Sequence, residues 1–532
     1  MKVDQNTLPY VYRLALVATL GGLLFGYDTA VVSGAVKAIR EFFVVPLMVD
    51  VSLAEKVIAG YRITLCVAVA IIWIAVSGML VRLFGWGKGA IFSVAIFVAT
   101  AVVLSRQFGK VPVVSLDNSN AITGFTVSSA LIGCIVGASI AGFVSSSLGR
   151  KRGLLMAAIL FFISGIGAAF PERMAFPGMQ PLIAFIFYRI LGGIGIGLAS
   201  MLSPMYIAEI APAEIRGKLV SWNQFAIVLG VFVVYFVNWF IAQRGNEDWN
   251  MTTGWRWMFL SGSMPSVVFI ILLAFIPETP RYLAFRNKTE KALEVLRKTV
   301  GKGNAEKCLQ EISGTLEIKS APWLSYGGLL IIISILLAAF QQFTGINVVL
   351  YYAPRIFQNM GTRLDISLMQ TVLVGAVNVV FTVIAITTVD RLGRKPLLIL
   401  GGIIMGFAMT AIGFTFYKES MGYLALVLIL IHTAGFAMSW GPVMWVVLSE
   451  IFPNSIRSAM SIATATVWIT DLIISWSFPV LDGNTWLVGV FHHGFAYWIY
   501  AVICFLSVLV VWKMVPETKG KTLENIENLW KK

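Results

Sequence analysis

The feature of this sequence that most constrains its fold is a series of fourteen long apolar runs separated by short polar loops. A helix needs about 20 mainly apolar residues to cross the hydrocarbon core of a bilayer. Lipid offers the backbone no hydrogen-bond partners, so only helices and closed barrels can span it. The chain is therefore predicted to be an all-α polytopic membrane protein. The predicted spans are 11–37, 59–82, 88–106, 122–147, 153–171, 181–207, 219–242, 257–276, 325–350, 367–389, 396–416, 423–447, 459–481 and 494–515.

Composition excludes several other classes of protein. Of the 532 residues 58% are hydrophobic and only 12% are charged, against about 25% charged residues in soluble domains. The net charge of +14 arises from basic loops between apolar runs, so we expect no nucleic-acid partner. The four cysteines are far apart and are predicted to be free thiols without a metal. The sequence contains no nucleotide-binding loop, zinc spacing or nucleophile triad, so no enzyme activity and no cofactor are expected.

Loop charge predicts the orientation in the membrane. Basic clusters occur at 149–152, 215–218, 281–322, 390–395 and in the tail from Lys519. With fourteen spans, all of these clusters fall on one side, while loop 107–121, which carries little positive charge, falls on the other. The positive-inside rule makes the basic side cytoplasmic. We therefore expect a multi-pass protein of the cytoplasmic (inner) membrane with both termini in the cytoplasm.

The two halves of the chain carry repeated loop motifs. Glu209, Pro212 and Arg216 recur 241 residues later as Glu450, Pro453 and Arg457. Gly149-Arg150-Lys151 recurs 244 residues later and Pro277-Glu278-Thr279 recurs 239 residues later. Duplicated halves with a substrate site at their interface are a common transporter plan. The predicted divisions are an N-terminal helical bundle (1–276), a cytoplasmic linker with short helices (277–324), a C-terminal helical bundle (325–515) and a cytoplasmic tail (516–532).

Five motifs relate the chain to a known family. They are Gly21–Asp28 (GGLLFGYD), Tyr188–Gly193 (YRILGG), Pro277–Arg281 (PETPR), Gln341–Asn347 (QQFTGIN) and Pro516–Gly520 (PETKG). With them the chain resembles the sugar porters of the major facilitator superfamily, and especially the bacterial D-xylose–proton symporters among them. The resemblance covers nearly the whole chain except roughly 58–115. It implies the major facilitator fold, two six-helix bundles that expose a sugar site to each side of the membrane in turn.

The segment 58–115 departs from that family, which has twelve spans. Here a helix pair is inserted between the first and second core spans, and a hairpin of two helices preserves the topology that follows. We favour a peripheral pair packed on the bundle surface. The alternative is an element that docks a partner or binds lipid, and Arg62 near its start could sit at an interface.

Two residues are candidates for proton coupling. Asp28 lies in the first apolar run, and a carboxylate at mid-membrane costs about 2.5–3.5 kcal/mol on insertion scales. Arg189, in another apolar run, is its natural partner. A carboxylate that alternates between an arginine and a proton couples proton movement to conformation. The resemblance implies that Asp28 is the proton acceptor and Arg189 its neighbour; the alternative is a static buried ion pair. Asp471 lies where the similar symporters have a neutral amide, and the sequence leaves open whether it faces the cavity or titrates.

Sugar recognition needs amides that donate and accept, together with an aromatic ring. Gln341, Gln342 and Asn347 can converge on one helix face, and Gly345 permits local unwinding. The resemblance implies that Gln224, Gln341, Gln342, Asn347 and Trp445 contact sugar hydroxyls, and that Phe25, Tyr351, Asn378 and Trp468 line the same cavity. For each polar residue the alternative is a helix–helix hydrogen bond. Val467 and Val231 replace glutamines of the similar symporters, so the sugar is left open between xylose and a related pentose or hexose.

Charged loop residues are candidates for a cytoplasmic gate. The resemblance implies an ion network between the halves that latches the outward-facing state. Exposed pairs contribute only about 0–1 kcal/mol each, but a network can bias two states that differ by a few kcal/mol. The predicted members are Arg150, Glu209, Arg216, Glu278, Arg281, Arg394, Glu450 and Arg457.

Taken together, the sequence predicts proton-coupled symport of a monosaccharide, D-xylose or a related pentose or hexose, driven by the proton gradient without a cofactor. The expected partners are the sugar, protons and the lipid bilayer, and the protein is expected to be monomeric. The first alternative is a facilitative sugar uniporter, which Asp28 with Arg189 argues against. A transporter-like sugar receptor is disfavoured because it needs a long cytoplasmic extension, and thirteen residues follow Lys519.

Overall fold

The computed structural model describes residues 5–107, 114–316, 322–419, 422–519 and 530. In these ranges the regular structure is helical and no strand occurs. Thirteen helices in the described part are long and apolar enough to cross a membrane. The prediction of an all-α polytopic membrane protein is therefore confirmed.

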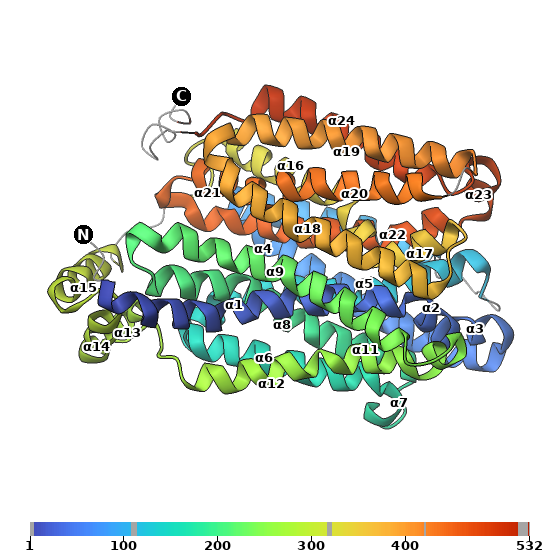
Figure 1. The fold of residues 1–532 in the computed structure, drawn as a ribbon, viewed down its shortest axis with the longest axis horizontal. Helices are drawn as coiled ribbons and strands as arrows, with labels where there is room; N and C mark the ends of the chain where they lie inside the picture. The colour runs from blue at the N-terminus through green and yellow to red at the C-terminus, as the bar shows by residue number, and fades with distance from the viewer. Residues whose placement is uncertain (1–4, 108–113, 317–321, 420–421, 520–529, 531–532) are drawn as a thin grey trace.

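The helices form two bundles, drawn as the blue-to-green and the yellow-to-red parts of Figure 1. The long helices of the first half are α1 (Leu8–Ala30), α5 (Leu116–Ser147), α6 (Arg150–Ala169), α8 (Pro181–Ile210), α9 (Ala213–Ala242), and α11 (Trp255–Ser261) continued by α12 (Ser263–Ala274). Those of the second half are α16 (Gly328–Phe343), α17 (Ile346–Asn359), α18 (Leu364–Leu392), α19 (Arg394–Tyr417), α20 (Tyr423–Met438), α21 (Trp440–Ile451), α22 (Met460–Gly483) and α24 (Phe495–Met514).

Shorter elements cap the two ends of the bundles. Three helices between the halves, α13 (Pro280–Phe285), α14 (Thr289–Thr299) and α15 (Lys302–Leu316), lie at the end where both chain termini lie, which we name the terminal end (Figure 1). The opposite end, named the distal end, carries η2 (Val31–Ala35), α2 (Val36–Ile39), η3 (Arg40–Val44), α3 (Pro46–Val49), α7 (Pro171–Met174), α10 (Glu247–Trp249), η4 (Asn250–Gly254) and α23 (Thr485–Phe491). The elements η1 (Gln5–Thr7) and η5 (Asn454–Ala459) complete the described chain.

Small residues let α5 and α8 approach closely. A Cβ atom added to Gly193 would collide with the backbone carbonyl of Ala130, and one added to Gly197 with that of Cys134. Without a hydrophobic force between helices in lipid, such close backbone contact is a main source of helix association. The glycine-rich run of α8 therefore packs helices together, as its place in an apolar span indicates.

Two membrane helices of the second half are broken near mid-span. Gly345 has φ 86° and separates α16 from α17, which agrees with the local unwinding predicted there. Ser439 has φ −131° and ψ −85° and separates α20 from α21. Each break frees backbone groups from the helix, and such groups are tolerated at membrane depth only where protein or a cavity satisfies them.

The inserted segment is a helical hairpin. Helix α4 (Val51–Gln107) reverses direction at Gly85, where φ is 77° and ψ is 169°. Across the turn, Trp73 Nε1 donates to the Ser93 carbonyl at 2.9 Å, and the hydroxyls of Ser77 and Ser93 bond to each other. The predicted spans 59–82 and 88–106 are the two legs of this hairpin. The single candidate span that covers them therefore contains two passes.

The hairpin lies on the bundle surface and contacts both halves. Near its start, the Tyr61 ring packs against Phe125 of α5, with ring centroids 5.2 Å apart. Near its turn, the Arg82 guanidinium lies over the Trp323 ring at 5.5 Å, and Met79 and Leu83 pack against the core of the second half. Large apolar side chains elsewhere on the pair are exposed, as expected for a lipid-facing surface. The geometry is that of a peripheral pair that crosses the boundary between the bundles.

Replacement of Gly85 by alanine should destabilise the hairpin. The Gly85 backbone lies in a region essentially restricted to glycine, so a Cβ there costs about 1–3 kcal/mol. We expect a lower midpoint of thermal unfolding in detergent, followed by tryptophan fluorescence. The matched control is Gly87→Ala, because Gly87 has open space around its Cβ position and no positive φ. Equal stability of the two variants would contradict the assigned turn.

Candidate functional site

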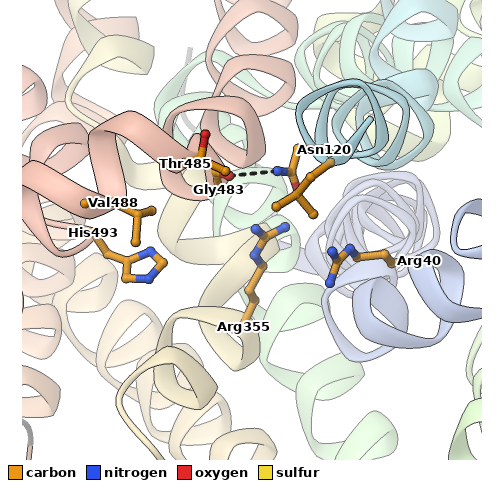
Figure 2. A pocket seen from close by; sticks show the side chains of 9 residues that line it. Arg40, Asn120, Arg355, Gly483, Thr485, Val488 and His493 are labelled. Carbon is orange, nitrogen blue, oxygen red and sulfur yellow. Dashed lines mark hydrogen bonds between the residues drawn. The ribbon is translucent and has the colours of Figure 1, made fainter. Parts of the chain in front are cut away.

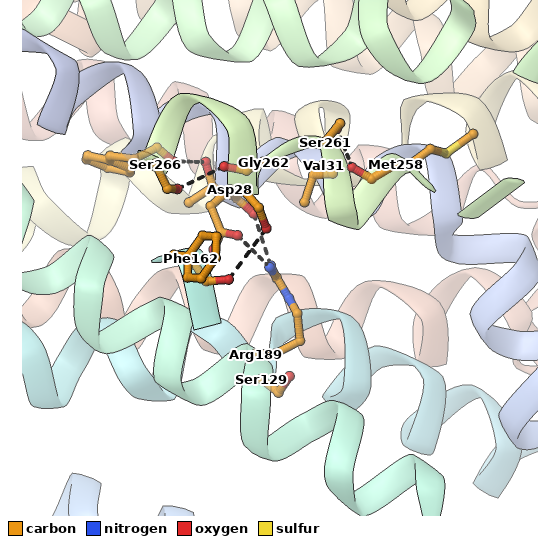
Figure 3. A network of polar contacts seen from close by, with 12 residues as sticks. Asp28, Val31, Ser129, Phe162, Arg189, Met258, Ser261, Gly262 and Ser266 are labelled. Carbon is orange, nitrogen blue, oxygen red and sulfur yellow. Dashed lines mark hydrogen bonds and ion pairs between the residues drawn. The ribbon is translucent and has the colours of Figure 1, made fainter. Parts of the chain in front are cut away.

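A buried ion pair joins the first and fourth core helices. Arg189 Nη1 lies 3.1 Å from Asp28 Oδ1, and Arg189 Nη2 donates to the Asp28 backbone carbonyl at 3.1 Å (Figure 3). Only 1% of the Arg189 side chain is exposed. Its guanidinium also lies 5.4 Å from the centre of the Phe259 ring, a cation–π contact. The predicted partners Asp28 and Arg189 are therefore brought together.

The Asp28 carboxylate is only half satisfied. Its Oδ1 atom is bound by Arg189, while Oδ2 is buried and has no hydrogen-bond partner. An unpaired buried polar atom costs about 1–3 kcal/mol. A proton on Oδ2 would neutralise the carboxylate, and so weaken its attraction to Arg189, without first displacing a hydrogen bond. The arrangement therefore suits a carboxyl group that changes its protonation state.

Three of the predicted sugar-binding amides form a hydrogen-bonded chain in the second half. Gln341 Nε2 donates to the carbonyls of Trp440 at 2.9 Å and Gly441 at 3.2 Å, just after the break at Ser439. Gln342 Nε2 donates to Gln341 Oε1 at 3.2 Å. Asn347 Nδ2 donates to Gln342 Oε1 at 2.5 Å, across the break at Gly345. The two broken helices thus bring the amides together, and their hydrogen bonds are available for exchange with hydroxyl groups.

One aromatic contact of the predicted cavity joins the halves, and another lies within the second half. Phe25 of α1 and Trp468 of α22 have ring centroids 5.5 Å apart. Tyr351 of α17 donates its hydroxyl to Asp471 Oδ2 at 3.2 Å. The remaining predicted residues come from three other helices: Gln224 from α9, buried Asn378 from α18 and half-buried Trp445 from α21. In the described part of the chain, no hydrogen bond or ring contact joins these three to the amide chain.

Direct contacts join the halves at the distal end. Asn120 Nδ2 of α5 donates to the Gly483 carbonyl of α22 at 3.1 Å (Figure 2). Trp476 Nε1 donates to the Ala121 carbonyl at 3.0 Å, and the Tyr235 hydroxyl of α9 donates to the Leu350 carbonyl of α17 at 2.6 Å. These contacts hold the two bundles together on the distal side of the amide chain.

An acidic residue that sequence reasoning missed organises the distal end. Asp482 is 1% exposed and pairs with Arg355 at 3.0 Å, with His493 Nδ1 at 3.1 Å, and accepts from Asn359 at 3.2 Å. The hydrogen bond to Asp482 raises the pKa of His493, although burial opposes this. Beside the cluster, a cavity of about 440 Å³ is lined by Arg40, Arg355 and His493 (Figure 2). The only sign of this cluster in the sequence is that Asp482, an acidic residue, directly follows an apolar run.

The charged motifs at the terminal end form equivalent clusters in the two halves. Arg150 pairs with Glu209 at 2.7 Å, and Arg394 pairs with Glu450 at 2.9 Å. Each cluster is completed by a carboxylate from the repeated PET motif. Glu278 accepts from the backbone N–H of Arg150 at 3.1 Å and of Lys151 at 3.2 Å. Glu517 accepts from those of Arg394 at 3.2 Å and Lys395 at 3.0 Å.

The two PET carboxylates differ in their electrostatics. Burial raises the pKa of Glu278 in spite of its N–H donors. Burial would also raise the pKa of Glu517, but the backbone N–H groups of Lys519, Arg394 and Lys395 outweigh it, and the pKa is lowered. Glu278 therefore holds its negative charge less firmly than its counterpart in the second half.

The ion network that was predicted to join the two halves at the terminal end stays a prediction. The described ion pairs of Arg150, Glu209, Arg394 and Glu450 each lie within one half. The Arg216 guanidinium donates to the Ala211 carbonyl of its own half at 3.4 Å. Arg281 is exposed. The Arg457 side chain lies outside the described part of the structure.

Comparison with known proteins decides the family. The family described as "Sugar (and other) transporter" matches residues 14–530. This chain belongs to the sugar transporter family. It is 45% identical to the D-xylose-proton symporter of Escherichia coli K12, over 99% of this chain and 97% of that one. It is 36% identical to the glucose facilitated diffusion protein of Zymomonas mobilis, over 99% of each chain. It is 35% identical to the arabinose-proton symporter of Bacillus subtilis, over 99% and 96% of the two chains.

Solved structures of relatives agree with the fold seen here. The E. coli xylose transporter in an inward open conformation superposes with a TM-score of 0.77, at 43% identity over 98% of this chain and 100% of that one. The same transporter bound to 6-bromo-6-deoxy-D-glucose gives a TM-score of 0.73, at 45% identity over 99% and 100%. The predicted major facilitator fold is thereby confirmed for this sugar transporter.

Loss of the His493 charge should destabilise this sugar transporter only at low pH. Because the folded-state pKa of His493 is raised, its protonated form contributes stability that is present at acidic pH and lost as the pH rises through that raised pKa. His493→Asn keeps a neutral donor near the Nδ1 position. We expect its unfolding temperature to fall below that of the unmodified protein at acidic pH and to converge with it at alkaline pH.

His492→Asn is the matched control for this measurement. His492 also has a positive φ and pairs with Glu419, but both side chains are exposed, and exposed pairs contribute little. A loss of stability in His493→Asn that is the same at every pH would show that the charge of His493 plays no part.

Proposed function

We propose that this sugar transporter couples the movement of a monosaccharide to that of a proton by alternating access. The observation that carries the proposal is the Asp28–Arg189 pair. It places a carboxylate with one unpartnered buried oxygen inside the membrane, against an arginine that is 1% exposed. An acid in such a place is expected to serve in proton transfer or coupling. Two of the relatives compared above are named as proton symporters.

In this proposal, α1 connects the proton site to the sugar cavity. Phe25 and Asp28 are three residues apart, so they lie on neighbouring positions of one helix face. Phe25 contacts Trp468 of the other half. Protonation of Asp28 weakens its attraction to Arg189 and frees α1 to shift relative to α8. Sugar in the cavity acts on the same helix through Phe25, so each ligand favours the same change of state.

The sugar is proposed to be D-xylose or a related pentose or hexose. The amide chain of Gln341, Gln342 and Asn347 offers both donors and acceptors, which suits a ring of hydroxyl groups. Val231 and Val467 are each 6% exposed and are proposed to give the site apolar walls. Relatives of 34–45% identity are named for xylose, arabinose and glucose, so the class of substrate is better supported than the individual sugar.

Facilitated diffusion is a second candidate, because the relative from Zymomonas mobilis bears that name. The half-satisfied Asp28 favours symport. A passive carrier needs no titrating group in its membrane core, and an acid kept there without use would cost stability.

The terminal end is proposed to face the cytoplasm, so that both termini lie on the cytoplasmic side of the inner membrane. The support is the gathering of the basic loops 149–152, 390–395 and 281–316 at that end. We further propose that the protein works as a monomer, driven by the proton gradient and without a cofactor.

Asp28→Asn should abolish uphill accumulation of sugar and leave counterflow exchange intact. The amide keeps the shape of the carboxyl but cannot take up a proton. The measurement is uptake of labelled D-xylose and D-glucose into proteoliposomes, with and without a pH gradient. Asp365→Asn is the control, because Asp365 is an exposed acid at the start of α18. Accumulation by Asp28→Asn, or uptake by the unmodified protein without sugar-dependent alkalinisation outside, would refute proton symport.

The orientation can be tested with single cysteines. In a variant whose four cysteines are serine, Trp86→Cys places a thiol at the exposed hairpin turn and Thr485→Cys places one at the distal end. An impermeant thiol reagent should label position 86 in inverted vesicles and position 485 in right-side-out vesicles. The reverse pattern would overturn the proposed orientation.

A further inference from the structure

Asp471 is a second acid in the membrane core, and neither the ion pair at Asp28 nor the clusters at the two ends of the bundle involve it. It lies at the middle of α22 and is 2% exposed. Its Oδ2 atom accepts from the Tyr351 hydroxyl of α17 at 3.2 Å, and Oδ1 accepts from the Ser475 hydroxyl at 3.0 Å. The Asn347 side chain, the last member of the amide chain, also faces it. Asp471 therefore belongs to the wall of the predicted sugar cavity.

The groups around Asp471 supply no positive charge. Helix α17 presents Tyr351 and Tyr352, α5 presents Cys134, and α16 presents amides. Tyr497 and Tyr500 of α24 lie further towards the distal end. The cations of the core are engaged elsewhere, Arg189 with Asp28 and Arg355 with Asp482. In the described part of the chain no ion pair includes Asp471, so its ionised form is an uncompensated charge.

Beside the Asn347 amide, Asp471 has two further hydrogen-bond partners, Tyr351 and Ser475, that tolerate either protonation state. Both are hydroxyl groups, which can donate or accept after a rotation of the hydroxyl hydrogen. An ionised Asp471 accepts from both, whereas a protonated Asp471 donates to one and accepts from the other. The same heavy-atom positions therefore serve both states, and a proton can bind or leave without repacking the helices.

Hydration of the cavity then decides which state is preferred. An unpaired carboxylate at mid-membrane costs about 2.5–3.5 kcal/mol on insertion scales, and water in an open cavity reduces that cost. A sugar that fills the cavity expels this water. Expulsion of water favours the neutral acid, so sugar binding promotes uptake of a proton.

We propose that Asp471 is a second proton-binding carboxyl of the transport cycle, one that takes up a proton when sugar occupies the cavity beside Asn347 and Tyr351. The inference rests on the proposed function, because it requires that sugar binds at the amide chain. It adds a proton site in the second half to the one at Asp28 in the first half.

Because of the position of Asp471, binding of this proton affects the contacts between helices. Tyr351–Asp471 and the hydrogen bond from the Tyr352 hydroxyl to the Ser475 carbonyl at 2.8 Å tie α17 to α22. The Tyr235–Leu350 contact ties α17 to the first half at the distal end. A change of charge at Asp471 therefore acts on the helix that closes the distal side of the cavity.

The test isolates Asp471 by removing the other acid. In weakly buffered detergent solution with an indicator dye, D-xylose is added to Asp28→Asn protein at a series of pH values, and sugar binding is measured in parallel. We expect uptake of up to a single proton per bound sugar over one pH interval. We expect none in the Asp28→Asn/Asp471→Asn double variant, which keeps the shape of the side chain. Asp28→Asn/Asp365→Asn should behave as Asp28→Asn.

A third variant keeps the proposal testable if the double variant does not fold. Asp28→Asn/Tyr351→Phe removes one donor to the carboxylate, which disfavours the ionised form, so the interval of proton uptake should move to higher pH. Sugar binding by Asp28→Asn without proton uptake at any pH, or an interval unchanged by Tyr351→Phe, would overturn the proposal. Failure of proton symport itself would appear separately, as uptake by the unmodified protein that is indifferent to a pH gradient.

Discussion

The pairing of Asp28 with Arg189 is the interaction on which the first half of this sugar transporter depends. An arginine that is 1% exposed inside the membrane has no water to solvate it, and an uncompensated charge there is expensive. The pair sets the position of α1 against α8. The backbone contacts of Gly193 and Gly197 then bring α5 against α8. The packing of α1, α5 and α8 thus depends on one buried ion pair and on two glycines that allow close backbone contact.

In the second half, buried polar groups in the membrane core are also satisfied by partners, but these partners are neutral amides instead of charged side chains. Its two broken helices expose carbonyls in the membrane core, and Gln341 satisfies those of Trp440 and Gly441. The chain continues through Gln342 to Asn347, so these amides are hydrogen-bonded to one another. At the proposed site, a sugar exchanges these bonds for its own. Recognition there would depend on the difference in free energy between two hydrogen-bonded networks.

The two ends of the molecule differ in how the halves relate. At the terminal end the described ion pairs Arg150–Glu209 and Arg394–Glu450 hold each half together internally. At the distal end hydrogen bonds such as Asn120–Gly483 and Tyr235–Leu350 cross from one half to the other. Each bundle is thus rigid at the terminal end, while the distal contacts must break when the transporter changes state. This arrangement suits rocking of two rigid bodies about a central site.

The sequence by itself determined the helical membrane fold, the duplication, the Asp28–Arg189 partnership and the break at Gly345. These depend on local hydropathy, on the cost of charge in lipid and on the backbone freedom of glycine, all of which can be read along the chain. Only the tertiary structure decided that Asp471 faces Tyr351 and Asn347, that Asp482 gathers Arg355 and His493, and that the hairpin contacts both halves. Those contacts join residues that are far apart in the sequence, or, for Asp482 and His493, depend on how the chain turns at a helix end. Whether two such residues meet depends on the angle and the relative position at which their helices pack. A local sequence pattern carries no information about either.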